Sequence, residues 1–305
     1  MVDKKFFYTP TGATMLGLLG PFLWGSTVSL IRTISETVGI AVGQVILYAV
    51  AAIFLYFLVG LPNWHKFNGW KAALLLFLAS LTSVCLCFAM ATSDGGVQTL
   101  EVGMFNYLSP CFTILLSMLI LGQKARWWVF PGVLTAAFGV FFVVLGDSEF
   151  SIASFTNRIM QNPLSYFLGL SAGFCWSTYS TLAKKWGNGA NPSTVIFFIN
   201  FLFFSCVLCF TDAEMPNPTW WSWIFVVLGA LAMGGAYAAW THGAIYGSLF
   251  ALSTASYFTP ALSVMFGVFL LDAQLSTSFL GGLALIITGS ILCATSVMKP
   301  KKIRK

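Results

Sequence analysis

The sequence predicts an all-α integral membrane protein with ten transmembrane helices, arranged as two inverted repeats of five helices each. Hydrophobic residues make up 58% of the 305 residues, charged residues only 8%, and the mean hydropathy is +0.87. Soluble domains carry about 25% charged residues. The apolar residues form ten long runs, and motifs of the first five runs recur in the last five. Within the runs apolar and polar residues do not alternate, as they do in the strands of an outer-membrane barrel.

Each apolar run is long enough for a helix that crosses a bilayer, which takes about 20 residues. We expect the spans at residues 12–34, 38–61, 69–92, 98–121, 127–146, 164–185, 192–212, 220–242, 248–271 and 277–298. The longest connection, residues 147–163, separates a first repeat, residues 1–146, from a second repeat, residues 164–298. A basic tail follows at residues 299–305.

The distribution of basic residues predicts the orientation of the chain, because cytoplasmic loops are enriched in Lys and Arg. With the N-terminus in the cytoplasm, all but two of the 15 Lys and Arg residues lie inside, and only Arg32 and Arg158 lie outside. We therefore expect both termini and the basic tail in the cytoplasm. The connecting loop, residues 147–163, is then periplasmic.

Three motifs indicate an internal duplication. FLWGSTVSLIR, which contains Trp24, aligns with FCWSTYSTLAK, which contains Trp176, at an offset of 152 residues. NYLSP, which ends at Pro110, aligns with SYFTP, which ends at Pro260, at an offset of 150, and GVLTAAFGV at residues 132–140 aligns with GLALIITGS at that same offset. Because five spans is an odd number, the second repeat enters the membrane upside down. Inverted repeats are a transporter architecture, and duplication without transport is the alternative.

Aromatic and small polar side chains concentrate in spans one, four, six, eight and nine. A central cavity lined by such side chains suits a flat, partly apolar solute or an organic cation. It does not suit a phosphate, since no Lys or Arg is expected in the middle of a span. For any single Trp the alternative is a contact with lipid or with the protein core. The candidate substrate-binding residues are Trp24, Thr27, Asn106, Tyr107, Trp176, Tyr179, Tyr237, Trp240, Ser256 and Tyr257.

Glu101 is the only acid that we expect within a span, where a charge is costly and usually functional. Its counterpart in the second repeat is Ala251, so the charge exists in one half only. We predict that Glu101 pairs with Arg32 as an outer gate or a positioning ion pair. The alternatives are a structural pair, an acid that reaches the outer interface, or proton coupling, which a nearby arginine disfavours by keeping the carboxylate ionised. Pro110 and Pro260 should kink spans four and nine, because proline removes a helix hydrogen bond, and these kinked spans should act as gates.

The sequence offers little support for an enzyme. The two histidines, His65 and His242, have no acid beside them within the membrane, and the chain contains no HExxH, GxSxG or Walker-type phosphate loop. The seven cysteines all fall in apolar runs, where they are typical packing residues. We therefore expect no catalytic site, no cofactor, no metal site and no disulfide. The net charge of +6 is explained by topology rather than by a nucleic-acid partner.

In its ordered set of motifs the chain resembles the drug/metabolite transporter superfamily with EamA-type repeats, and among them the aromatic amino acid exporters. The motifs that carry the resemblance are LWGSTVSLIR from Leu23, LEVGMFNYLSP from Leu100, ILGQK from Ile120, NPLSYFL from Asn162, GGAYAAW from Gly234 and SYFTPALS from Ser256. The resemblance extends over nearly the whole chain. It implies a multi-pass exporter of aromatic amino acids in the bacterial inner membrane.

The prediction is thus an exporter that works by alternating access, with a small aromatic amino acid as substrate and the lipid bilayer as its surroundings. A broad exporter of organic cations is the alternative within transport. A membrane scaffold without transport, or a lipid-handling protein, is the alternative outside it. The sequence predicts neither the oligomeric state nor the order of preference among substrates.

Overall fold

The computed structural model describes residues 4–63, 69–146, 151–186, 190–211, 215–247, 252 and 255–296, and most of these residues are helical, with no β-strand among them. Seven helical stretches in this part of the chain are long and apolar enough to span a membrane, and two apolar helices are shorter. The prediction of an all-α membrane protein is confirmed. The basic tail, His65 and residues 147–150 of the connecting loop lie outside the described residues.

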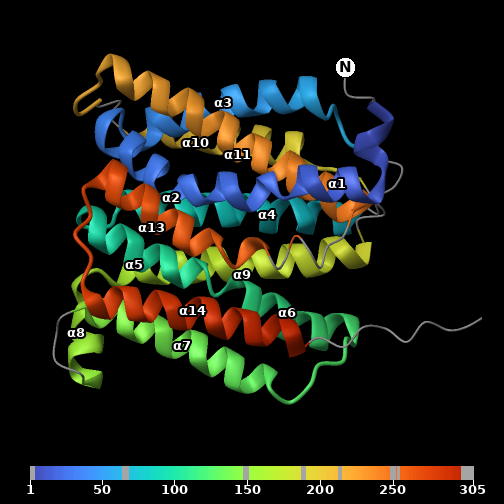
Figure 1. Cartoon of the computed structure of the whole chain (residues 1–305). Helices are drawn as coiled ribbons and strands as arrows, with labels where there is room; N and C mark the ends of the chain where they lie inside the picture. The colour runs from blue at the N-terminus through green and yellow to red at the C-terminus, as the bar shows by residue number, and fades with distance from the viewer. Residues whose placement is uncertain are drawn as a thin grey trace, which may run out of the picture.

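The helices follow the order of the expected spans (Figure 1). They are η1 (Lys4–Tyr8), α1 (Pro10–Gly17), α2 (Leu19–Thr37), α3 (Ile40–Leu58), α4 (Gly69–Ala91), α5 (Gly95–Asn106), α6 (Ser109–Leu121), α7 (Val129–Leu145), α8 (Ile152–Gln161), α9 (Pro163–Trp186), α10 (Ser193–Phe210), α11 (Trp220–Tyr246), α13 (Thr259–Leu271) and α14 (Thr277–Ser296). The connecting loop forms a helix of its own, α8, which none of the expected spans included.

The fourth expected span is interrupted rather than kinked. Helix α5 ends at Asn106 and α6 begins at Ser109, so Pro110 occupies the second position of a new helix. A proline costs no hydrogen bond there, because the first N–H groups of a helix have no partner within it. Pro260 has the same place in α13. The two prolines therefore start helices instead of bending them, which corrects the expectation of a kink.

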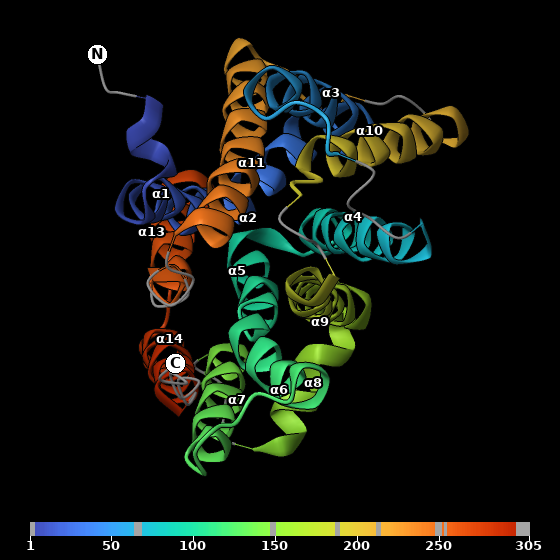
Figure 2. The ribbon, with the colours of Figure 1, turned by 90° about the vertical axis from the view of Figure 1, so that its right-hand side faces the viewer.

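The helices form two groups that lie side by side (Figures 1 and 2). In the first group α2 packs on α11 and α13, and α3 packs on α10 and α11, with α1 alongside α11. In the second group α9 packs on α4, α5 and α6, and α7 pairs with α14, while α8 caps one end. Each group combines helices from both halves of the sequence.

The two ends of the molecule carry different elements. At the left in Figure 1 lie the end of α2, the beginning of α5 and the helix α8. We name this the α8 end. We name the opposite end, where η1 lies, the η1 end; it faces the viewer in Figure 2.

Glycines let α7 and α14 approach closely. A Cβ atom added to Gly139 would lie 2.6 Å from the carbonyl oxygen of Gly282, and one added to Gly282 would lie 2.5 Å from that of Gly139. Gly132 and Gly289 face each other in the same way at the other crossing point. Small residues at such positions are typical of membrane helices that associate through backbone contact.

Candidate functional site

Five aromatic residues from the two groups meet near the middle of the molecule, and we name them the aromatic cluster. The ring centroid of Trp24 lies 5.4 Å from Trp176, 5.9 Å from Tyr237 and 5.2 Å from Trp240. Trp176 also lies 5.4 Å from Tyr179 and 5.3 Å from Tyr237. Trp24, Tyr237 and Trp240 belong to the first group of helices, and Trp176 and Tyr179 to the second. The cluster thus bridges the two groups.

The tryptophans of the cluster are more exposed than its tyrosines. Trp24, Trp176 and Trp240 are partly exposed, whereas Tyr179 and Tyr237 are buried. Indole rings offer large flat faces with one polar N–H group, which suits a planar solute. Edge-to-face contacts hold the rings of Trp24 and Trp176 at 77° to each other. The two indoles therefore contact each other directly, and the partly exposed surface of the three tryptophans is what a flat ring could pack against.

The other candidates fall outside this cluster. Tyr107 lies beside Ser263 of α13, and Tyr257 lies beside Cys111 and Cys293. Asn106 ends α5, where its backbone carbonyl packs against Gly173 of α9. The proposal that these residues bind substrate therefore rests on the sequence alone.

Two further candidates carry hydroxyl groups. Ser256 adjoins Tyr257 in the chain. Thr27 lies three residues after Trp24, about one turn of the helix, and its buried hydroxyl has no hydrogen-bond partner. Thr27 is therefore the candidate hydroxyl that α2 carries next to the aromatic cluster.

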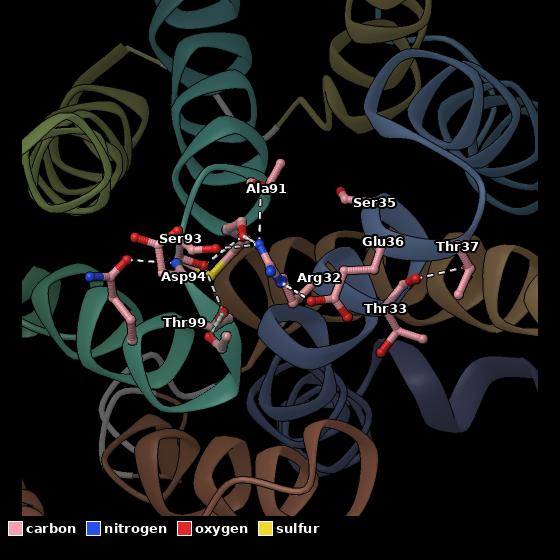
Figure 3. A network of polar contacts seen from close by, with 12 residues as sticks. Arg32, Thr33, Ser35, Glu36, Thr37, Ala91, Ser93, Asp94 and Thr99 are labelled. Carbon is pink, nitrogen blue, oxygen red and sulfur yellow. Dashed lines mark hydrogen bonds and ion pairs between the residues drawn. The ribbon is translucent and has the colours of Figure 1, made fainter. Parts of the chain in front are cut away.

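Arg32 does not pair with Glu101, and the predicted ion pair is wrong. The Nε atom of Arg32 donates to Glu36 at 2.6 Å, one turn along the same helix. Its Nη1 atom donates to the backbone carbonyls of Met90, Ala91 and Ser93 at 3.1, 3.0 and 2.5 Å (Figure 3). Arg32 thus joins α2 of the first group to the α4–α5 junction of the second group, at the α8 end.

Glu101 instead binds within the second group. Its carboxylate accepts from Nη2 of Arg158 on α8 at 3.1 Å and from the hydroxyl of Tyr166 on α9 at 2.5 Å. Its side chain is only 3% exposed, against 37% for Arg158. The contact with Glu101 raises the pKa of the Arg158 guanidinium, so this arginine stays charged. Glu101 therefore has a permanent cationic partner.

The ion pair of Glu101 and Arg158 lies within the second group, away from the boundary between the groups. On the opposite face of α5, Leu100 packs against Gly267 and Gly103 lies near Val28, so that face meets the first group. Glu101 faces α8 and α9, away from the boundary between the groups. The ion pair therefore does not have to break when the two groups move relative to each other.

Replacing Arg158 by alanine should lower the free energy of unfolding by about 2 kcal/mol. Breaking a buried pair typically costs about 3–5 kcal/mol, and the partial exposure of Arg158 reduces this value. Adding Glu101→Gln should restore most of the loss, because the amide oxygen is neutral and still accepts from Tyr166. Thermal unfolding of the purified variants measures both effects. An Arg158→Ala protein as stable as the parent would contradict the pairing.

Two buried amides were missed by the sequence prediction. Gln44 of α3 and Asn200 of α10 are both 0% exposed. The Oε1 atom of Gln44 accepts from the thiol of Cys87 on α4 at 3.3 Å, but its Nε2 atom has no partner, and neither polar atom of Asn200 has one. The sequence could have indicated them, because an amide side chain in the middle of an apolar run is rare and costly to bury.

These features define a polytopic helical membrane protein with an aromatic site between two groups of helices. The profile of the EamA-like transporter family matches the chain twice, at residues 11–145 and 163–295. The chain therefore belongs to the EamA-like transporter family, which is a family of transporters and not of enzymes.

The curated relatives agree with this family. The aromatic amino acid exporter YddG of Salmonella typhimurium is 35% identical over 93% of this chain and 97% of its own length. The aromatic amino acid exporter YddG of Escherichia coli K12 is 36% identical over 92% and 96%. A solved structure described only as "Crystal structure of protein" matches with a TM-score of 0.64 and 18% identity, covering 93% of this chain and 96% of that one. The last match concerns the fold alone.

Proposed function

We propose that this protein exports aromatic amino acids across the bacterial inner membrane by alternating access. The observation that carries the proposal is the aromatic cluster, which two groups of helices build across their boundary. A ring held there contacts both groups at once, so movement of one group against the other changes its exposure. The likeness to two aromatic amino acid exporters along nearly their whole length supports this substrate class.

The mechanism rests on ten spans in two inverted repeats. Two matches to one family profile, at residues 11–145 and 163–295, support the duplication. Helix pairs support the inversion, since the pair α2–α11 becomes the pair α9–α4 when each helix is exchanged for its counterpart in the other half. The related pairs α3–α11 and α10–α4 differ, because α3 packs along α11 more extensively than α10 along α4. Exchanging the two packings would generate a second conformation.

The distribution of Lys and Arg supports an orientation with both termini in the cytoplasm and the α8 end outside. In that orientation Arg32 closes the outer side of the boundary, where it holds three backbone carbonyls of the second group. The partly exposed tryptophans then receive substrate from the cytoplasmic side. Glu101 faces away from the boundary between the groups, and its permanent partner Arg158 argues against proton coupling through this carboxylate. Transport is then driven by the amino acid gradient.

Liposomes that contain the purified protein should release preloaded L-tryptophan without a pH gradient. Trp24→Ala should slow this release by up to about tenfold, because it removes an indole that would contact the ring of the substrate, and one aromatic contact contributes about 0.5–1.5 kcal/mol. Trp127→Ala is the matched control, since Trp127 is 74% exposed on the surface. Its release rate should equal that of the parent.

Three results would redirect the proposal. Release that requires an inward proton gradient would establish coupling. Release of a flat organic cation such as tryptamine, with none of tryptophan, would favour a cation exporter. Release of neither solute by a well-folded protein would favour a membrane protein without this transport activity.

A further inference from the structure

A second polar site lies where α3, α10 and α4 meet, at the boundary between the two groups. Tyr48 is its centre: its ring lies 5.5 Å from Phe197 and 5.6 Å from Phe204, and its hydroxyl lies 3.3 Å from the thiol of Cys87. Gln44 is one turn away on α3 and shares the same thiol. The first group contributes Gln44 and Tyr48, and the second contributes Cys87.

Asn200 belongs to this site by its position on α10. Phe197, Asn200 and Phe204 are spaced by three and four residues, so they share one face of the helix. Since the rings of Phe197 and Phe204 both contact Tyr48, Asn200 faces α3 between them. Its side chain is 0% exposed.

The polar atoms of this site lack partners within the protein. Gln44 Nε2 and both polar atoms of Asn200 make no hydrogen bond. A buried polar group without a partner costs about 1–3 kcal/mol. The site thus keeps amide N–H donors and an amide oxygen free, at a cost to stability that a bound polar group would recover.

The polar site lies on the outer side of the aromatic cluster. Along the helix axes, Gln44 and Tyr48 lie about 6 and 12 Å from the α8 end of α3, whereas Trp24 lies about 20 Å from the α8 end of α2. The two sites are connected through Phe197, whose ring lies 5.1 Å from Tyr237 of the aromatic cluster and 5.5 Å from Tyr48. A solute whose polar end lies near Tyr48 would therefore place its ring against Phe197 and Tyr237, on the outer side of the aromatic cluster.

We propose that Gln44 and Asn200 form the site for the α-carboxylate and α-ammonium groups of the exported amino acid. This inference rests on the proposed function. The amide N–H groups donate to the carboxylate, and the Asn200 oxygen accepts from the ammonium group. Neutral amides satisfy both charges of a zwitterion, which has no net charge. The polar end of the amino acid then faces outward, and its ring faces the aromatic cluster.

The site also determines specificity. An amine without a carboxylate leaves the amide N–H donors unpaired, and leaving buried donors unpaired is a strong means of rejecting a ligand. The two amides thus favour amino acids over organic cations of the same ring size. Asn200→Asp replaces the amide that donates to the substrate carboxylate with an anion. This variant should therefore prefer amines over amino acids.

The test compares binding of L-tryptophan and tryptamine, which share the indole ring, to purified protein by calorimetry. Asn200→Leu should weaken tryptophan binding by about tenfold or more and tryptamine binding by clearly less, because tryptamine loses only the contact between its ammonium group and the Asn200 oxygen. Asn200→Asp should bind tryptamine more tightly than the parent does. Because leucine removes the unpaired amide, Asn200→Leu should be at least as stable as the parent, which thermal unfolding checks. Ser205→Ala on the same helix, whose hydroxyl bonds only its own turn, is the control.

The outcomes separate the two proposals. If the parent protein does not bind tryptophan, the proposed function fails and this inference fails with it. If both Asn200 variants bind tryptophan as tightly as the parent does, the proposed function stands. The amides then do not bind the substrate, and this inference is overturned. Equal losses of tryptophan and tryptamine in Asn200→Leu would assign Asn200 to the shape of the cavity and overturn the specificity claim.

Discussion

Replacing Gly282 by leucine should prevent stable packing of α14 against α7. The added Cβ atom would lie 2.5 Å from the carbonyl oxygen of Gly139 and 2.7 Å from the backbone nitrogen of Val143. Neither backbone atom can yield as a flexible side chain does, so the two helices must separate along their whole crossing. Overpacking typically costs about 1–3 kcal/mol, and a clash with backbone lies at or beyond the upper end of this range.

The neighbouring glycine provides a matched control. Gly281 precedes Gly282 on the same helix, and a Cβ atom added there meets nothing within 4 Å. Gly281→Leu therefore makes the same chemical change and should leave stability unchanged. Heating each purified variant before size-exclusion chromatography measures the folded fraction, and Gly282→Leu should lose about 6–12 °C in apparent Tm. Equal midpoints for the two leucine variants would contradict the close packing of α7 and α14.

The sequence predicted the distribution of helices well, because apolar length and period are local properties. The aligned motifs paired Trp24 with Trp176 as equivalent positions of the two repeats, and in the structure their rings also meet. The breaks within the spans were harder to predict. Pro110 marks where a helix changes, but the sequence alone does not show whether proline bends one helix or begins the next.

The predicted ion pair failed for a geometric reason. Arg32 and Glu101 lie near the same end of the molecule, so depth alone made them plausible partners. The face of the helix decides the contact, however, and Glu101 points toward α8 and α9 while its neighbour Leu100 points toward the first group. Its actual partner, Arg158, belongs to a connection that the sequence suggested only as a loop. Local patterns do not predict how such a connection folds back on the bundle.

Replacing Arg32 by methionine should open the boundary between the groups at the α8 end. Methionine keeps the apolar stem but removes the donors to the backbone carbonyls of the α4–α5 junction. A hydrogen bond from a charged group contributes about 1.5–3 kcal/mol, and every 1.4 kcal/mol changes an equilibrium about tenfold. The outward-open population should therefore rise by about ten- to a hundredfold.

Cys87 reports this opening. It is 0% exposed, lies four residues before the end of α4 and contacts Gln44 across the boundary. In a protein whose other cysteines are replaced by serine, Cys87 should react with a membrane-impermeant maleimide added outside at least tenfold faster in Arg32→Met.

Glu36→Gln removes only the exposed partner of Arg32, whose ion pair at the surface contributes little. It should therefore label at the rate of the parent. If Arg32→Met labels no faster than Glu36→Gln while both proteins remain folded, the arginine does not hold the outer side closed. Rapid labelling of Arg32→Met alone would show that Arg32 holds the outer side closed. The pair of Glu101 and Arg158 cannot explain such a difference, since it remains intact within the second group in both variants.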